Sequence, residues 1–211
     1  MKKNYTDITI LVDRSGSMNC IKNDMEGGLQ QFLKEQCETQ GDLTVSLFTF
    51  DNYLECDFIE KKKDNIDFSN IKIIPRGWTA LLDSLKTVID SVGIRLSEKK
   101  ENERPDNVIF LIVTDGLENA STKTTHSQIA EMIKHQQEKY NWKFIFLGAN
   151  QDAVTIGSQL NISPDLSMTF NSSSLGINNL FQATSGMLKC FRCGTVSNMS
   201  FSTSDRENAM K

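Results

Sequence analysis

The sequence predicts an α/β protein with a doubly wound, mostly parallel sheet of about six strands, one antiparallel edge strand, and helices on both faces. Three observations support this fold class. Strand-like and helix-like segments alternate along the chain without an internal repeat or a long low-complexity linker. Residues 108–113 (VIFLIV) are all apolar, which is typical of a central parallel strand covered on both faces. Residues 80–96 carry apolar side chains at helical spacing, the strongest such period in the chain.

The first half of the chain is expected to supply three strands and one helix. Strands are predicted over 5–12, 43–50 and 53–59, and a helix over 20–37. Apolar residues recur at helical spacing within that helix, and Gly41 ends the unit. Asp51 and Asn52 form a turn signal between the second and third strands. These two strands are therefore predicted to form a hairpin, with the third strand as the antiparallel edge.

The second half is expected to continue the alternation of helices and strands. Helices are predicted over 80–96, 125–140, 152–160 and 174–191, and strands over 108–113, 142–148 and 166–170. Thr125 and Gln128 have the spacing of a capping box at the start of one helix. Residues 1–194 are predicted to form a single domain, and the polar residues 195–211 a loosely held tail.

The composition is that of a folded protein and disfavours several classes of partner. Of the 211 residues, 38% are hydrophobic and 24% are charged, which is enough apolar material for one core. The net charge of -4 disfavours a nucleic-acid partner, and the lysines at 61–63 are predicted to form a solvated turn. No window approaches the ~18 apolar residues of a membrane span, and Asp7 interrupts the stretch that would suggest a signal peptide. We therefore expect no membrane partner, and the oligomeric state stays open.

The five cysteines are scattered along the chain, which predicts reduced thiols and a cytoplasmic location. The pair Cys190-x-x-Cys193 lacks the second Cys or His pair of a structural zinc site. It also lacks the strand-then-helix context of a redox motif. We expect a buried or incidental role for both thiols, with zinc or redox chemistry as the alternative.

Polar residues follow two predicted strands at the point where each strand ends. Asp13 follows the first strand, and Asp115 follows the apolar strand over 108–113. In the usual strand order of this topology the two strands are neighbours at the switch point, so the two carboxylates are expected to converge. Two facing carboxylates repel each other unless a cation lies between them. The hydroxyls of Ser15 and Ser17 add hard oxygen ligands of the kind that Mg²⁺ and Ca²⁺ prefer.

These residues resemble the metal-ion-dependent adhesion site of von Willebrand factor type A domains. The sequence DRSGSM follows a strand, a Thr precedes the next long helix in RGWTALLDSL, and TDG follows the central strand. The resemblance extends from residue 5 to about residue 170. It implies a Rossmann-like fold and a site that holds Mg²⁺, or else Mn²⁺ or Ca²⁺. The implied metal ligands are Asp13, Ser15, Ser17, Thr79 and Asp115.

The resemblance also implies how the site is used. In this family the two serines and the threonine usually contact the metal directly, and the aspartates often act through bound waters. The sixth position is left for a carboxylate of the partner. This implies a divalent-metal-dependent protein-binding module, not an enzyme, whose partner supplies an Asp or Glu. The phrases DGLENAS and FLGANQDA resemble stand-alone bacterial and bacteriophage members, and a phage origin would place the protein in the host cytoplasm.

The loops around this site are expected to form a rim that contacts the partner. The predicted rim residues are Met18, Asn19, Arg76, Trp78, Leu117 and Glu118. Trp78 departs from the family pattern, in which a small residue often precedes the motif threonine. Its indole either lines the binding surface or folds back as a lid on the core, and the sequence leaves both open. Glu118 and Asn119 either rim the site or serve only the approach to the next helix.

Two other interpretations compete with a metal-bridging module. DRSGSM alone is also typical of a polar turn that caps the following helix, although the other motif residues arrive at matching places. The alternative function is a Mg²⁺-dependent phosphohydrolase with Asp13 as the nucleophile. The sequence lacks a D-x-D pattern and a phosphate-binding Gly-Lys-Ser/Thr loop. His126 and His135 fall in or before one helix rather than at a strand end, and Ser17 lacks a G-x-S-x-G elbow.

Overall fold

A computed structural model describes residues 1–211 and contains one six-stranded sheet with the order β3-β2-β1-β4-β5-β6. The strands are β1 (Lys2–Asp13), β2 (Asp42–Phe50), β3 (Leu54–Lys62), β4 (Pro105–Thr114), β5 (Lys143–Ala149) and β6 (Ser167–Phe170). All neighbouring pairs are parallel except β2 and β3, which are antiparallel. This confirms the predicted, mostly parallel sheet with one antiparallel edge strand.

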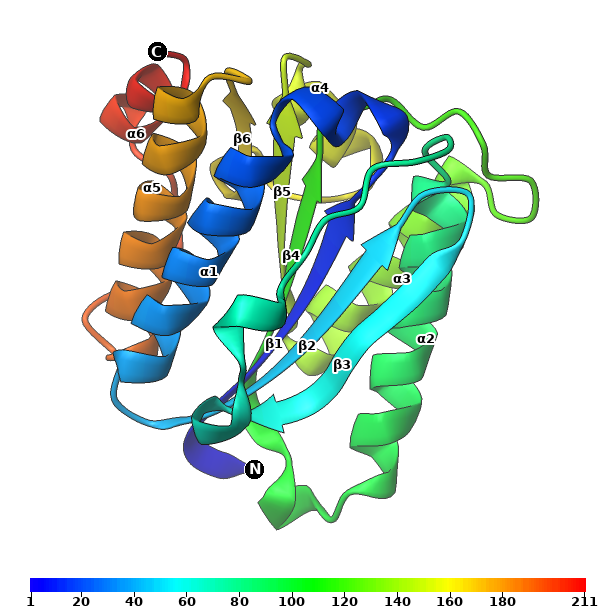
Figure 1. Ribbon diagram of the computed structural model, residues 1–211. Helices are drawn as coiled ribbons and strands as arrows, with labels where there is room; N and C mark the ends of the chain where they lie inside the picture. Colours follow the sequence, from blue (N-terminus) through cyan, green and yellow to red (C-terminus); the bar gives the residue numbers. More distant parts are fainter.

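Helices cover both faces of the sheet, as predicted (Figure 1). The α-helices are α1 (Lys22–Glu38), α2 (Leu81–Glu98), α3 (His126–Tyr140), α4 (Ala153–Gln159), α5 (Ser174–Arg192) and α6 (Thr203–Ala209). On one face α1 packs beside α5, and α6 packs against α5 and β6. On the opposite face α2 lies beside α3, which also contacts α4 (Figure 1).

The strand order creates a switch point between β1 and β4. The connection through α1 joins β1 to β2 on one face, whereas α2 leads into β4 on the other (Figure 1). β1 therefore lies between β2 and β4 and pairs in parallel with both. Val12 lies opposite Val113, so the carboxyl ends of β1 and β4 are side by side. The loops that follow these two strands share one edge of the sheet, where ligands of such folds bind.

The core lies around the central strands and the helices that cover them. Ile109 and Phe110 of β4 are fully inaccessible to solvent, as the unbroken apolar run predicted. The helices α1 and α5 approach closely where Gly28 faces Phe181. A Cβ atom added at Gly28 would lie 2.2 Å from the Phe181 ring, so the absence of a side chain there permits the contact.

The predicted elements all appear, each with ends within three residues of the expected ones. The capping box of Thr125 and Gln128 at the start of α3 is confirmed. One detail is wrong: β3 extends to Lys62, so Lys61 and Lys62 lie in the edge strand rather than in a turn. Exposed lysines on an edge strand discourage pairing with a second chain. None of the helices combines the length and the apolar character needed to cross a membrane.

The C-terminal residues are packed, so the prediction of a loosely held tail after residue 194 is wrong. Phe201 and Ala209 are buried, and Ala209 ends the helix α6. The guanidinium of Arg206 donates to the Ser167 carbonyl at 2.6 Å, and the Asn171 N–H donates to the Ala209 carbonyl at 2.9 Å. The segment is polar in composition, but its few apolar residues and a capping box are enough to fasten it to β6 and α5.

Candidate metal site

The carboxyl ends of β1 and β4 bring Asp13 and Asp115 to one site. The Ser15 N–H donates to Oδ1 of Asp13 at 2.6 Å. The hydroxyls of Ser15 and Ser17 share a hydrogen bond of 3.0 Å, and the Ser17 hydroxyl donates to Oδ1 of Asp115 at 2.7 Å. A series of hydrogen bonds through Ser15 and Ser17 therefore connects the two carboxylates, although 102 positions separate them in the sequence.

Thr79 joins the same site from the segment before α2. The position that a Cβ atom would take at Gly116 marks a point close to all of these groups. An atom there would lie 3.0 Å from Oγ1 of Thr79, 3.7 Å from Oγ of Ser17 and 3.8 Å from Oδ2 of Asp13. Three oxygens from two segments thus border one small space beside Gly116, and the glycine keeps that space free of a side chain.

The chemistry of these groups fits a hard divalent cation. Two carboxylates and three hydroxyls offer only oxygen, the ligand type of Mg²⁺, Mn²⁺ and Ca²⁺. The protein has no cluster of three or more His, Cys, Asp or Glu side chains that could hold a metal. A metal at this site therefore depends on the hydroxyl groups as well as on Asp13 and Asp115. Ser17 is exposed and Asp115 is half-buried, so the site opens to solvent on that side.

Burial makes the negative charge at this site costly in the absence of a cation. Asp13 is inaccessible to solvent, and its burial raises its pKa from 3.8 to about 6. The charge of Asp115 raises that pKa further, whereas hydrogen bonds from Thr114 and Ser15 lower it. Burial also raises the pKa of Asp115, and the Ser17 hydroxyl opposes this. A bound cation would favour both ionised forms.

Thr114, which the sequence did not single out, and Asn119, whose role it left open, hold the candidate ligands in position. The Thr114 hydroxyl lies 2.6 Å from Oδ2 of Asp13 and 3.0 Å from the Gly116 carbonyl. The side chain of Asn119 accepts from the Thr79 N–H at 2.9 Å, and the Asn119 N–H donates to the Thr79 carbonyl at 3.0 Å. The Thr of TDG was a visible signal for the first of these contacts; the second depends on how the loop folds.

The loop that follows β1 and carries Ser15 and Ser17 is here called the metal loop. A cluster of ion pairs fastens it to the neighbouring segments. Arg14 is buried and pairs with Asp51 at 3.1 Å and with Glu55 at 2.5 Å. Arg76 pairs with the same two carboxylates, at 2.7 Å and 2.5 Å. The Arg14 hydrogen bond is the largest cause that lowers the pKa of Glu55 to about 2. The Arg76 N–H also donates to the Arg14 carbonyl at 2.8 Å, so this cluster joins the loop after β1 to the segment that carries Thr79.

The structure shows which of the predicted rim residues are exposed; whether they contact a partner stays a prediction. Asn19 and Arg76 are exposed, and Trp78 and Leu117 are 66% and 63% exposed beside the site. The indole of Trp78 therefore does not fold back as a lid on the core. Met18 is fully buried, so the prediction that it lines the rim is wrong.

The prediction that Glu118 lines the rim is also wrong, because its carboxylate accepts hydrogen bonds from groups within the protein. It accepts from the Leu82 N–H at 2.9 Å at the start of α2, and from the N–H and the hydroxyl of Ser121 at 2.7 Å and 2.8 Å. An acidic side chain at this place stabilises the N-terminus of α2 and closes the loop. This role differs from both that the sequence left open, because Glu118 binds the start of the preceding helix α2 and not the approach to α3.

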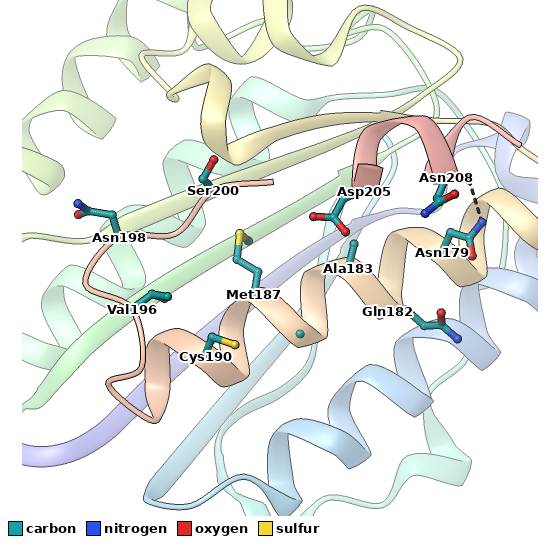
Figure 2. A pocket seen from close by; sticks show the side chains of 11 residues that line it. Asn179, Gln182, Ala183, Met187, Cys190, Val196, Asn198, Ser200, Asp205 and Asn208 are labelled. Carbon is teal, nitrogen blue, oxygen red and sulfur yellow. Dashed lines mark hydrogen bonds between the residues drawn. The ribbon is translucent and has the colours of Figure 1, made fainter. Parts of the chain in front are cut away.

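A polar hollow of about 620 Å³ lies elsewhere, between α5 and the chain that follows it (Figure 2). The Asn179 side chain donates to the Asn208 carbonyl at 2.8 Å across it. Cys190 lines the hollow, and both Cys190 and Cys193 are exposed free thiols, so of the predicted buried or incidental role only the incidental one fits their exposure. The one acidic group there, Asp205, is bound by the cap of α6. The hollow therefore offers a lone thiol but no cluster of groups of the kind that holds a metal.

Comparison with known proteins identifies relatives by structure only. No protein-family model and no curated protein matches the sequence. The structure is similar to proximal thread matrix protein 1 of the mussel byssus, with a TM-score of 0.63 and 17% identity over 88% of this chain and 46% of that one. A second structure of that protein, described as having a zinc-occupied MIDAS motif, has a TM-score of 0.62 and 18% identity over the same shares.

The structure is also similar to a bacterial domain, over nearly the whole length of that domain. The von Willebrand factor domain of the type V pili tip protein Mfa5 from Porphyromonas gingivalis has a TM-score of 0.61 and 10% identity, over 87% of this chain and 94% of that one. By contrast, the chain spans less than half of the mussel protein. Identities this low establish the fold alone. The chain has the fold of the von Willebrand factor type A domains.

Proposed function

We propose that this chain is a protein-binding module that uses a Mg²⁺ ion to bridge to an Asp or Glu of its partner. The observation that carries the proposal is the set of oxygens around Gly116, where Asp13, Ser17 and Thr79 border one small space open to solvent. The mussel structure with a zinc-occupied motif supports divalent-metal binding by this fold in general. The MIDAS-like pattern in the sequence supports Mg²⁺, with Mn²⁺ or Ca²⁺ as substitutes.

Each residue has a defined part in this proposal. The hydroxyls of Ser15, Ser17 and Thr79 would bind the ion, and Asp13 and Asp115 would balance its charge. When bound, the ion supplies a positive charge with an exchangeable position that a carboxylate can occupy. The exposed side near Ser17 is where a partner would approach.

The geometry argues against the phosphohydrolase alternative. A nucleophilic carboxylate needs a free oxygen aimed at the substrate. Asp13 is fully buried, and its two oxygens are engaged by the Ser15 N–H and the Thr114 hydroxyl. His126 and His135 both lie in α3, which begins at residue 126, beyond the loop that follows Asp115. The proposed setting is the cytoplasm, in keeping with five free thiols.

Titration calorimetry with Mg²⁺ alone tests the site first. Asp13→Ala and Thr79→Ala should each abolish measurable Mg²⁺ binding while the circular dichroism of the fold is retained. Thr87→Ala is the matched control, because Thr87 is an exposed threonine on α2 whose hydroxyl only donates to the Asp83 carbonyl. Binding to a partner should then disappear in excess EDTA. Partner binding that survives EDTA would contradict the bridge.

A further inference from the structure

Three exposed hydrophobic side chains lie in the segments that border the candidate metal site. Tyr53, Trp78 and Leu117 are 73%, 66% and 63% exposed. Each lies within two positions of a residue that belongs to the site or supports it: Tyr53 follows Asp51, Trp78 precedes Thr79, and Leu117 follows Asp115. We call these three side chains the apolar collar. Single exposed apolar residues are common on protein surfaces, but a group around one polar site indicates an interaction surface.

Hydrogen bonds hold the three collar segments together. The Trp78 N–H donates to the Asn52 side chain at 2.9 Å, which joins the β2–β3 turn to the segment before α2. The Tyr53 N–H donates to the Asp51 carboxylate at 2.8 Å within that turn. The Thr79 carbonyl accepts from two N–H groups of the loop that follows Leu117. Figure 1 shows the three segments at the same end of the sheet, beyond the carboxyl ends of β1 and β4.

This arrangement lowers the entropic cost of binding. The backbone at Tyr53 and Trp78, and the loop just after Leu117, are held by hydrogen bonds before a partner arrives, so binding has mainly to order side chains. Tyr and Trp are also the residue types most enriched where interfaces gain affinity. The collar is therefore a preformed apolar surface around a site that takes a carboxylate.

The charges beside the collar favour an isolated acidic residue over an acidic run. Arg14 and Arg76 are the arginines next to the metal loop, and both are already paired with Asp51 and Glu55. Each guanidinium already faces two carboxylates of the protein, so the positive charge beside the metal loop is largely balanced before a partner arrives. Additional acidic residues would instead meet the collar, where burial of an unpaired charge is costly.

We infer that the partner segment carries one Asp or Glu with aromatic or aliphatic residues next to it. This inference rests on the proposed metal bridge and adds the specificity of that bridge. The carboxylate would go to the metal, and the apolar neighbours would pack on Tyr53, Trp78 and Leu117. The partner that occupies the collar and the metal site is therefore a protein loop of this composition. A membrane surface or an acidic polymer does not combine one carboxylate with apolar neighbours.

The test is a selection of phage-displayed, disulfide-closed random peptides on the immobilised full chain in Mg²⁺, with release by EDTA. We expect the released peptides to be enriched in one acidic residue with apolar neighbours. Released peptides that contain acidic residues without apolar enrichment would overturn the inference and leave the metal bridge intact. If EDTA releases no enriched peptide, the proposed function fails and the inference fails with it.

Binding of a selected peptide to variants gives the second readout. Trp78→Ala and Tyr53→Ala should each weaken the peptide about tenfold or more, with Mg²⁺ affinity unchanged. Tyr140→Ala and Ile94→Ala are matched controls, because these residues are 55% and 61% exposed and line a hollow at the opposite end of the sheet. They should change the affinity less than about twofold. Equal losses in collar and control variants would overturn the inference.

Discussion

Replacing Asp13 with asparagine should stabilise the metal-free protein, because it removes a buried charge without changing the shape of the side chain. The Asn oxygen can still accept from the Ser15 N–H, where the carboxylate accepts at 2.6 Å. The Asn amide can donate to the Thr114 hydroxyl, which then donates to the Gly116 carbonyl 3.0 Å away. No buried polar group is left without a partner.

The pKa of Asp13 sets the magnitude and the pH dependence of this effect. Burial raises that pKa from 3.8 to about 6, so the folded protein holds a proton that the unfolded chain releases within this window. The free energy of unfolding therefore decreases as the pH rises from 3.8 to about 6. Above that window the folded protein bears the full cost of the buried charge on Asp13. The rise of the pKa from 3.8 to about 6 corresponds to about 3 kcal/mol, because each pKa unit is worth about 1.4 kcal/mol. Asp13→Asn should recover up to that amount at pH 7.5 and almost none near pH 4.

Urea unfolding in EDTA at several pH values measures this difference. Asp90→Asn serves as the control, because Asp90 is an exposed residue of α2 paired only with Lys86, and its change should stay within about 0.5 kcal/mol. Addition of Mg²⁺ at pH 7.5 should stabilise the wild type but not Asp13→Asn. A variant that is less stable than the wild type, by the same amount at both ends of the pH range, would refute the reasoning.

Three further predictions concern the candidate metal site and the C-terminal segment. Gly116→Ala places a Cβ atom 3.0 Å from Oγ1 of Thr79, so the Mg²⁺ affinity should fall at least about tenfold with the fold retained. Unchanged Mg²⁺ affinity in calorimetry would contradict this prediction. The Mg²⁺ affinity of the wild type should fall about tenfold per pH unit below about 6, because Asp13 must release its proton, and a flat profile would disprove it. Phe201→Ala should lower the free energy of unfolding by about 3 kcal/mol, because Phe201 is buried. A loss below about 1 kcal/mol would show that the C-terminal segment contributes little.

The convergence of Asp13 and Asp115 could be predicted because topology alone brings them together. The apolar run of β4 identifies it as a central strand, and a parallel neighbour places Asp13 and Asp115 at one edge of the sheet. That inference needs only the order of the elements and the direction of the strands. Thr79 was assigned through the resemblance to the von Willebrand factor type A domains; hydrophobic periodicity predicted only that a helix, α2, begins just after it.

The errors concern side-chain direction, which the order of elements does not determine. A short 3-10 helix over Gly16–Cys20 turns Met18 into the core, although it directly follows a metal-loop serine. Glu118 turns back to the first turn of α2, where the free N–H groups of a helix attract a carboxylate. The C-terminal segment is polar on average, yet buried Phe201 and Ala209 are enough to fix it. Composition averages over these few contacts and misses them.

The ion-pair cluster could not be predicted either, because its members come from three separate segments. Arg14 belongs to the metal loop, Glu55 to β3, and Arg76 to the segment before α2. Their pairing depends on the hairpin lying next to the metal loop, which the strand order places there. The sequence offers no spacing rule for such a contact.

Diffraction from a crystal soaked in Mn²⁺, with data collected at the manganese absorption edge, tests the central claim most directly. We expect one anomalous peak beside Gly116, about 2 Å from the hydroxyl oxygens of Ser15, Ser17 and Thr79. In a crystal of Asp13→Ala the peak should be absent. A wild-type crystal with no peak at this place, or with a peak only elsewhere on the molecule, would contradict the assignment of the site.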